Sequence, residues 1–201
     1  MSEEQQSLIV PLDKYLKVGI HIGTKFRTTY MNPFIYKTRP DGLSVLNVQE
    51  IDKRLGVAAK FLSKYKPEEI LVVCRRENGW KAVKLFQKLT GIKCFPGRYP
   101  PGILTNANLE DFIETKLLLA VDPVPDRNAI KDAFNMGVPI IALCDTNNET
   151  TLIDFVIPCN NKGKRSLGLI FWILAKEYLK ARGIVKSDEE VKITDEEFTA
   201  E

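Results

Sequence analysis

Two aspartates in this 201-residue chain have the surroundings of acid–base groups. Asp122 and Asp145 each follow an apolar run, in the segments AVDPVPD and LCDTNNETT, and fall just past the expected carboxyl ends of two strands. Ligands of open parallel sheets bind at that edge, where paired carboxylates could exchange protons with a substrate. However, Pro123, Thr146 and Asn147 follow them, and short acceptor side chains commonly start turns and helices in such segments. The structural interpretation is favoured over the catalytic one.

The other reactive residue types show no catalytic or metal-binding spacing. His21 is the only histidine, and Cys74, Cys94, Cys144 and Cys159 form no C-x-x-C pair, so no zinc-site spacing can be written. Three of these cysteines lie in or beside apolar runs, where a free cysteine is usually a small buried hydrophobe. A cysteine nucleophile would need a base, and the histidine is on a different element. We expect no metal, no cofactor and reduced thiols, as is typical of a cytoplasmic protein.

Nucleotide-binding fingerprints are missing from the sequence. The first long apolar strand continues as LVVCRRENGW, without the G-x-G-x-x-G that lets a pyrophosphate approach a helix N-terminus. The segment NNKGKRS matches a phosphate loop only in part, because a Walker motif needs glycine where Pro158 stands and Ser or Thr where Arg165 stands. An enzyme acting on a phosphorylated or nucleotide substrate stays open as an alternative, and its expected mark is a closed, ligand-sized pocket.

Basic side chains gather in four loops instead. These loops are TKFRTTYMNP, IYKTRPDG, FPGRYPPG and CNNKGKRS. Folded RNA is recognised through phosphates, 2′-hydroxyls and shape, for which Lys, Arg, Asn, Thr and backbone amides on loops are suited. In the last loop, Lys162 to Arg165 fall at an expected helix N-terminus, where free N–H groups and the helix dipole favour an anion. Each base alone is as well explained by solvation, but the four loops together favour RNA.

The elements that position these residues follow from hydrophobic periodicity. Strands are expected over residues 69–74, 92–95, 115–121, 138–144 and 154–158, and helices over 11–17, 48–64, 78–89, 126–135 and 163–182. Runs that are apolar at every position suit strands covered on both faces, and alternation with helices implies parallel pairing. The pattern predicts a three-layer α/β/α sandwich, Rossmann-like or flavodoxin-like, with a mainly parallel five-stranded sheet. A Pro-Asp-Gly turn within residues 34–46 predicts an N-terminal β-hairpin.

Charge divides the chain into a basic body and an acidic end. Residues 187–201 hold seven acids and one base, which leaves 28 bases and 19 acids, a net charge of +9, for residues 1–186. We predict a polar leader over residues 1–7, one domain over 8–186 and an acidic tail over 187–201. A basic body suggests a polyanionic partner, although charge alone is weak evidence. A free interaction module that uses the tail is a third alternative. We expect no membrane segment, because no apolar run approaches about 20 residues.

Three segments resemble the universal small-subunit ribosomal protein S-two family. The first, over residues 138–178, carries P-x-x-A-x-x-D-T-N, a hydrophobic-D-hydrophobic run, I-P-x-N and R-S in the family's order. Its matching positions are Pro139, Ala142, Asp145, Thr146, Asn147, Asp154, Ile157, Pro158, Asn160, Arg165 and Ser166. The second, over residues 15–36, agrees at Gly19, His21, Gly23, Asn32 and Pro33, with Val18 in the family's alanine position. The third, over residues 97–106, agrees at Arg98, Tyr99, Gly102, Thr105 and Asn106.

The resemblance implies binding to small-subunit ribosomal RNA, contact with neighbouring small-subunit ribosomal proteins, and no catalysis or small-molecule substrate. The bacterial helical insertion is missing, because Lys66-Pro67 leads directly to the next strand, so the chain resembles the archaeal and eukaryotic branch. RNA contact is expected at Lys25, Arg27, Lys37, Arg39, Arg98, Asn106, Asn160, Lys162, Lys164 and Arg165, with Arg54 added from the basic face of its helix. Asp145, Thr146 and Asn147 are expected to organise a turn rather than to touch RNA.

Overall fold

A parallel β-sheet forms the centre of the computed structural model, which describes residues 8–185 and 194–199. Its strands are β3 (Ile70–Cys74), β4 (Lys93–Pro96), β5 (Leu117–Ala120), β6 (Ile140–Cys144) and β7 (Phe155–Pro158). All neighbours pair in parallel, in the spatial order β4-β3-β5-β6-β7. Counted along the chain within the sheet, this is the 2-1-3-4-5 order of flavodoxin-like folds. The five-stranded parallel sheet predicted from the sequence is confirmed.

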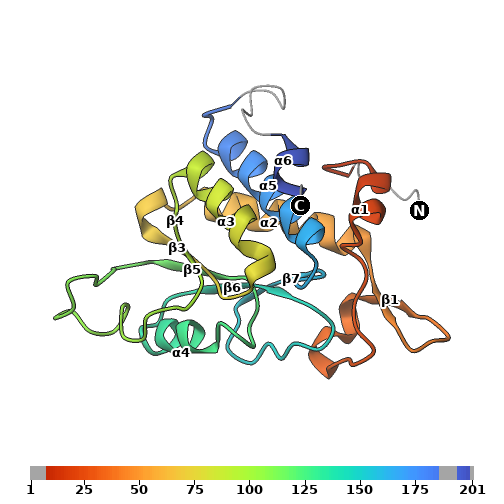
Figure 1. Ribbon diagram of the computed structural model, residues 1–201, viewed down its shortest axis with the longest axis horizontal. Helices are drawn as coiled ribbons and strands as arrows, with labels where there is room; N and C mark the ends of the chain where they lie inside the picture. Colours follow the sequence, from red (N-terminus) through yellow and green to blue (C-terminus); the bar gives the residue numbers. More distant parts are fainter. Residues whose placement is uncertain (1–7, 186–193, 200–201) are drawn as a thin grey trace, which may run out of the picture.

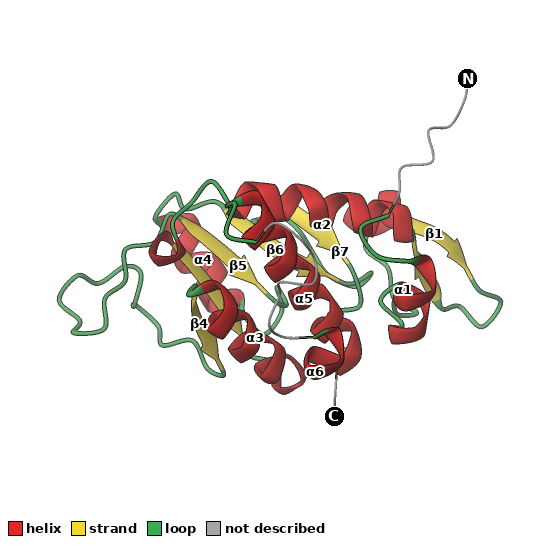
Figure 2. Cartoon of the chain, turned by 90° about the horizontal axis from the view of Figure 1, so that it is seen from above, coloured by secondary structure: helices red, strands yellow, loops and turns green. Residues whose placement is uncertain are grey.

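Helices cover the two faces of the sheet unequally. Helices α2 (Val48–Leu62), α3 (Glu77–Thr90) and α5 (Lys164–Ala181) lie on one face, and α4 (Arg127–Asn135) lies on the other (Figures 1 and 2). Strand side chains divide between the two sides, since Val72 belongs to the core under α2, α3 and α5, and Leu71 to the core on the α4 side. Every residue of β3, β5 and β6 is buried, which explains why these strands read as unbroken apolar runs.

Loops complete the layer on the α4 side. The 3-10 helix η1 (Thr29–Phe34) contributes the buried Met31, and the β4–β5 loop contributes Tyr99, Ile103 and Leu104. The Tyr99 hydroxyl donates a hydrogen bond of 3.1 Å to the Asp132 carboxylate on α4, which fixes this loop against the helix. Because no helix connects β4 to β5, the loop side chains supply the apolar cover that a helix would otherwise provide.

The N-terminal part forms a small subdomain beside the sheet. It contains α1 (Leu12–Val18) and the predicted hairpin, which is confirmed as the antiparallel strands β1 (Ile35–Thr38) and β2 (Ser44–Leu46). Gly42 takes a φ of +84° in the hairpin turn, a conformation that other residues rarely adopt. On the other edge of β2, Gly23 donates its N–H to the Ser44 carbonyl (3.0 Å), and Ser44 donates to the Thr24 carbonyl (3.1 Å). Residues 22–24 therefore lie beside β2 opposite β1.

Element ends differ from the sequence prediction by one or two residues. The strand expected over 138–144 begins at Ile140, since Pro139 has no N–H to give to a ladder. The helix expected over 48–64 ends at Leu62, and the one expected over 163–182 runs from Lys164 to Ala181. Along the described part of the chain, no helix is long and apolar enough to cross a membrane.

Part of the acidic segment packs on the domain. Residues Asp195–Thr199 form helix α6, which lies against α5 and buries Phe198 to 1% exposure. Gly168 of α5 makes this approach possible, because a Cβ at that position would lie 2.3 Å from the Phe198 carbonyl oxygen. The predicted leader over residues 1–7 and the predicted start of the tail at residue 187 lie outside the described residues.

Candidate nucleic-acid interface

The loops that follow the five strands form one edge of the sheet, called here the carboxyl edge. Asp122, which follows β5, is fully buried at this edge and forms an ion pair with the Arg76 guanidinium. Its other oxygen accepts hydrogen bonds from the Val124 backbone (3.0 Å) and from the Asn148 amide (3.1 Å). A buried carboxylate with this set of partners is structurally satisfied. The structural interpretation of Asp122 is therefore the one that its contacts support.

Asp145, which follows β6, has its own cation. Its carboxylate receives Lys162 Nζ at 2.8 Å and the Thr146 N–H at 2.6 Å. Lys162 also donates to the Asn147 side-chain oxygen (2.8 Å), and the Asn148 N–H donates to the Asp145 carbonyl (3.0 Å). The expectation that Asp145, Thr146 and Asn147 organise a turn is confirmed. With each aspartate bound to a separate base, the two carboxylates do not form a shared acid–base site.

The N-terminal basic loop is fastened to this turn through Thr146. The Thr146 hydroxyl accepts the Thr24 N–H at 2.9 Å and lies 3.0 Å from the Phe26 carbonyl, to which it donates. The Thr28 N–H donates to the Thr146 carbonyl at 2.9 Å. These bonds fix the backbone on both sides of Lys25 and Arg27, whose side chains are exposed. Two sequence motifs about 120 residues apart therefore meet at the carboxyl edge.

Gly23 is the residue that allows this close approach. A Cβ at Gly23 would lie 2.5 Å from Thr146 Cγ2 and 3.0 Å from the Ser44 carbonyl oxygen. We expect Gly23→Ala to lower the free energy of unfolding by about 1–3 kcal/mol, the usual range for overpacking. Thr146→Ser removes the methyl group but keeps the hydroxyl. Gly23→Ala should therefore lower the free energy of unfolding by less when Ser is at position 146 than when Thr is there. Urea unfolding of the two single variants and the double variant measures this, and equal costs in both backgrounds would contradict the contact.

The structure brings several of the predicted bases to the carboxyl edge. Lys25 and Arg27 lie there through the Thr146 contacts, Arg98 follows β4, and Lys164 and Arg165 begin α5 directly after β7. Because α3, α4 and α5 each follow the carboxyl end of a strand, their N-termini also point to this edge. The partial positive charge of three helix ends adds to that of the side chains. The edge therefore carries several exposed bases and three helix N-termini, together with the exposed acids Glu77 and Glu149.

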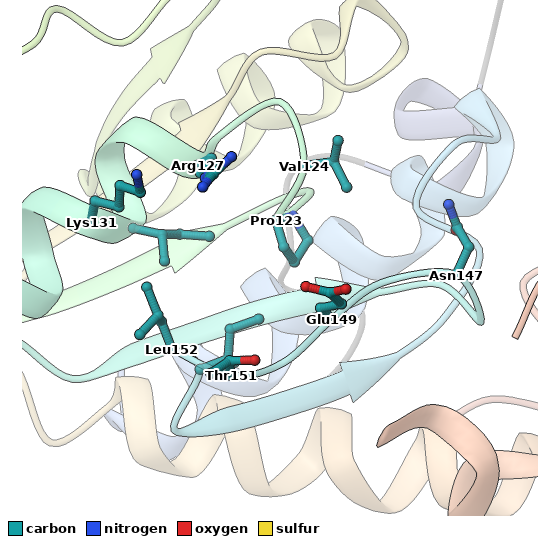
Figure 3. A pocket seen from close by; sticks show the side chains of 10 residues that line it. Pro123, Val124, Arg127, Lys131, Asn147, Glu149, Thr151 and Leu152 are labelled. Atoms are coloured by element: carbon teal, nitrogen blue, oxygen red, sulfur yellow. The ribbon is translucent and has the colours of Figure 1, made fainter. Parts of the chain in front are cut away.

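Sequence reasoning missed three further bases at this edge. Arg75 follows β3 and shares a cleft of about 80 Å³ with Arg98. Arg127 and Lys131 lie one turn apart on α4 and face a groove of about 610 Å³ that also contacts Asn147 (Figure 3). The spacing of Arg127 and Lys131 in DRNAIKD, four residues, places both bases on one face of a helix and was the signal available in the sequence.

Other predicted contacts are used inside the fold. Arg54 donates to the Val156 carbonyl (3.0 Å) and stacks 4.5 Å from the Phe34 ring centre, so it attaches α2 to β7. The Asn160 amide donates to the Gly19 carbonyl (3.2 Å), and its oxygen accepts the Gly163 N–H (3.1 Å). These contacts account for both residues without RNA, and their RNA contact stays a prediction.

The remaining predicted contacts lie far from one another. Asn106 is in the β4–β5 loop, whereas Lys37 and Arg39 are in the hairpin, and the two segments lie at opposite ends of the long axis (Figure 1). One compact site therefore does not contain all of the residues named from the sequence. The carboxyl edge holds the largest group of them.

Asp126 is a buried carboxyl at the same edge. It accepts the N–H groups of Arg75 (2.9 Å) and Asp122 (3.2 Å), and burial raises its pKa from 3.8 to about 6, although these hydrogen bonds oppose the shift. Protonation is therefore easier in the folded state than in the unfolded one, and stability from this group is fully present below about pH 4 and lost as pH rises through 6.

The corresponding experiment compares wild type with Asp126→Asn. The free energy of unfolding of wild type minus that of the variant should fall by about 3 kcal/mol between pH 4 and pH 7, because two pKa units correspond to that energy. Urea unfolding at several pH values measures the difference. Parallel pH profiles for the two proteins would show that Asp126 does not titrate in this range.

The reactive residue types offer no catalytic or metal centre within residues 8–185 and 194–199. All four cysteines are buried and unpaired, and burial raises the pKa of Cys74 and Cys94 to about 12. These thiols stay protonated and are poor nucleophiles. In the same residues, no group of three or more His, Cys, Asp or Glu side chains is placed to hold a metal ion.

Comparison with known proteins gives one consistent result. A family model described as "Ribosomal protein S2" matches residues 15–115 and 110–181. The small ribosomal subunit protein uS2 of Nanoarchaeum equitans is 50% identical over 190 residues, which is 94% of each chain. The uS2 proteins of Pyrobaculum islandicum and Thermoplasma acidophilum are 49% and 43% identical, and each alignment covers 98% of this chain and at least 97% of the relative. These relatives are archaeal, in agreement with the branch indicated by the missing insertion.

Proposed function

The chain belongs to the ribosomal protein S2 family, and on this premise we propose that it holds small-subunit ribosomal RNA through the carboxyl edge of its sheet. It is a structural constituent of the small ribosomal subunit and not an enzyme. Ribosomal RNA and neighbouring ribosomal proteins are its partners, in the cytoplasm. What the family leaves open is which surface of this chain meets the RNA.

One observation carries the proposal. The crevice in which a flavodoxin-like fold would bind a small ligand is filled by the chain's own ion pairs, Arg76 with Asp122 and Lys162 with Asp145. Bases surround this filled crevice and point outward. The filled crevice does not enclose a substrate, and the groove of about 610 Å³ beside Arg127 is open to solvent rather than closed. The edge instead presents charge to a large polyanion.

The proposed RNA-binding surface, called the basic edge, consists of exposed or half-exposed bases at or beside the strand ends. They are Lys25, Arg27, Arg75, Arg98, Arg127 and Lys164. Within the described residues, none of these side chains forms an ion pair, so their charges are available to phosphates. Arg165 lies next to them at the start of α5, whereas the charge of Lys162 is balanced by Asp145. RNA backbone contacts require this combination of fixed loops and unpaired bases.

The opposite edge of the sheet supplies an internal control. Helix α5 runs 18 residues from the basic edge, a length of roughly 27 Å, and Arg182 just beyond its end donates to the Tyr65 carbonyl. Lys60, in the last turn of α2, and Lys64, just beyond its end, lie at that far edge and are exposed. Bases are therefore present at both edges, and the proposal depends on which set meets RNA.

Sedimentation tests the assignment to the ribosome. Native lysate is run through a sucrose gradient at low and moderate salt, and the chain is followed with an antibody. We expect it to travel with the small subunit in both conditions. If it remained at the top of the gradient, the ribosomal function would be wrong for this chain.

A further inference from the structure

A second surface lies between α1 and the hairpin, away from the basic edge. It is a groove of about 570 Å³ whose apolar walls come from α1, Ile22, the hairpin and Val48 at the start of α2. Four of its side chains are exposed although they are large and apolar, namely Leu12 (47%), Leu16 (44%), Ile22 (39%) and Tyr36 (69%). A cluster of this kind on one face usually marks an interaction site.

The fold holds the walls of this groove in place. On α1, Tyr15 is buried, and its hydroxyl donates to Asp52 of α2 at 2.6 Å, so Leu12 and Leu16 are kept on the outer side. On the hairpin, the Leu46 N–H donates to the His21 carbonyl at 2.8 Å, and the Leu46 side chain is buried. The groove is thus preformed, and a partner would not have to order it on binding.

The charged groups that line the groove are basic, and Tyr36, Asn47 and Gln49 add uncharged polar groups. Lys37 and Arg39 lie at the groove, and among the residues that the structure describes no Asp or Glu lines it. Arg39 has only a loose ion pair with Asp41 (3.5 Å), in which both side chains are about half exposed. His21 Nδ1 is buried at this groove without a hydrogen-bond partner within the described residues. Desolvation lowers the pKa of His21, which favours the neutral ring near pH 7.

These features distinguish a protein partner from RNA. The outer surface of folded RNA offers phosphates and riboses, which would leave the aliphatic floor of the groove unmatched. Protein interfaces combine an apolar centre that includes aromatic side chains with a polar rim, as this groove does. The positive rim selects a partner segment that carries carboxylates.

We propose that the groove between α1 and the hairpin binds a segment of a neighbouring small-subunit protein that presents apolar side chains flanked by carboxylates. The inference rests on the proposed function, since it takes the partner to be another component of the same subunit. The apolar side chains fill the floor beside Leu12, Leu16 and Tyr36, and the carboxylates pair with Lys37 and Arg39. This gives the two hairpin bases a protein partner in place of the RNA contact expected from the sequence.

Site-specific photo-crosslinking identifies the occupant. The full chain with Leu16 replaced by benzoylphenylalanine is assembled into small subunits, irradiated and analysed by mass spectrometry, and a second chain carries the same group at Val57, an exposed residue of α2. We expect position 16 to crosslink to one ribosomal protein, at a segment with apolar and acidic residues. Crosslinking to ribosomal RNA, or a yield no higher than at position 57, would overturn the proposal.

A charge variant separates this inference from RNA binding. Leu12→Asp combined with Leu16→Asp should make release of the chain from the subunit about tenfold faster, because it places like charges against the partner. Its affinity for extracted small-subunit RNA should be unchanged, and Val57→Asp should change neither quantity. An unchanged release rate would refute the proposal for the groove and leave the proposed RNA binding at the basic edge untouched. Loss of RNA affinity in this variant would instead mean that the groove binds RNA.

Discussion

Arg76→Ala is expected to lower the free energy of unfolding by about 3–5 kcal/mol, the usual cost of leaving one member of a buried ion pair alone. The Asp122 side chain is 0% exposed and would keep only the Val124 N–H and the Asn148 amide as donors. These two bonds reach one carboxylate oxygen, so the other would lose its partner. Urea or thermal unfolding measures the loss.

Arg75→Ala provides the matched control for this experiment. Arg75 is the next residue in the chain, its side chain is exposed, and within the described residues it forms no ion pair. Its contact with Asp126 is made by the backbone N–H, which alanine retains. We expect the free energy of unfolding of this variant to be within about 0.5 kcal/mol of the wild-type value. Adding Asp122→Asn to Arg76→Ala should recover part of the loss, and equal destabilisation by the two arginine variants would show that the ion pair is not important.

Removing four bases of the basic edge should change the salt dependence of RNA binding. For Lys25→Ala, Arg27→Ala, Arg98→Ala and Lys164→Ala combined, the slope of log K against log[salt] should become shallower by roughly 3, at 0.7–0.9 for each lost phosphate contact. Affinity at fixed salt should fall by about tenfold for each contact. Filter binding or fluorescence titration with extracted small-subunit RNA, over a range of salt, gives both quantities.

The control removes the same charge from the far edge. Lys60, Lys84 and Lys88 are exposed lysines on the second halves of α2 and α3, and the exposed Lys64 lies two residues beyond the end of α2. Their combined replacement by alanine should leave the salt slope nearly unchanged. If both variants lowered the slope equally, RNA binding would depend on total charge, and the basic edge would have no special role.

The sheet could be predicted because its signal is local. Strands β3, β5 and β6 are apolar at every position since both of their faces are covered, and the helices between them show regular periodicity. The cover on the α4 side was not foreseen in detail. Tyr99, Ile103 and Leu104 belong to a loop rich in Pro and Gly, where no periodic pattern indicates which side chains turn inward.

The site was predicted less completely than the fold, because a base in a sequence does not reveal its partner. Arg54 lies on a helix face with Lys53 and Lys60, but its guanidinium bonds to Val156, 102 residues away. Lys162 was placed correctly at the start of a helix, yet it is bound to Asp145 and Asn147. Nothing in the segment LVVCRRENGW distinguishes Arg76 from Arg75, although Arg76 pairs with Asp122, whose side chain is 0% exposed.

The most direct test of the account maps protein–RNA crosslinks on intact small subunits by ultraviolet irradiation and mass spectrometry. The basic edge predicts nucleotide adducts in the peptides that contain Lys25 and Arg27, Arg75, Arg98, Arg127 and Lys164, and none in the peptides that contain Lys60, Lys64, Lys84 and Lys88. Adducts concentrated on the second halves of α2 and α3, with none at the strand ends, would contradict it.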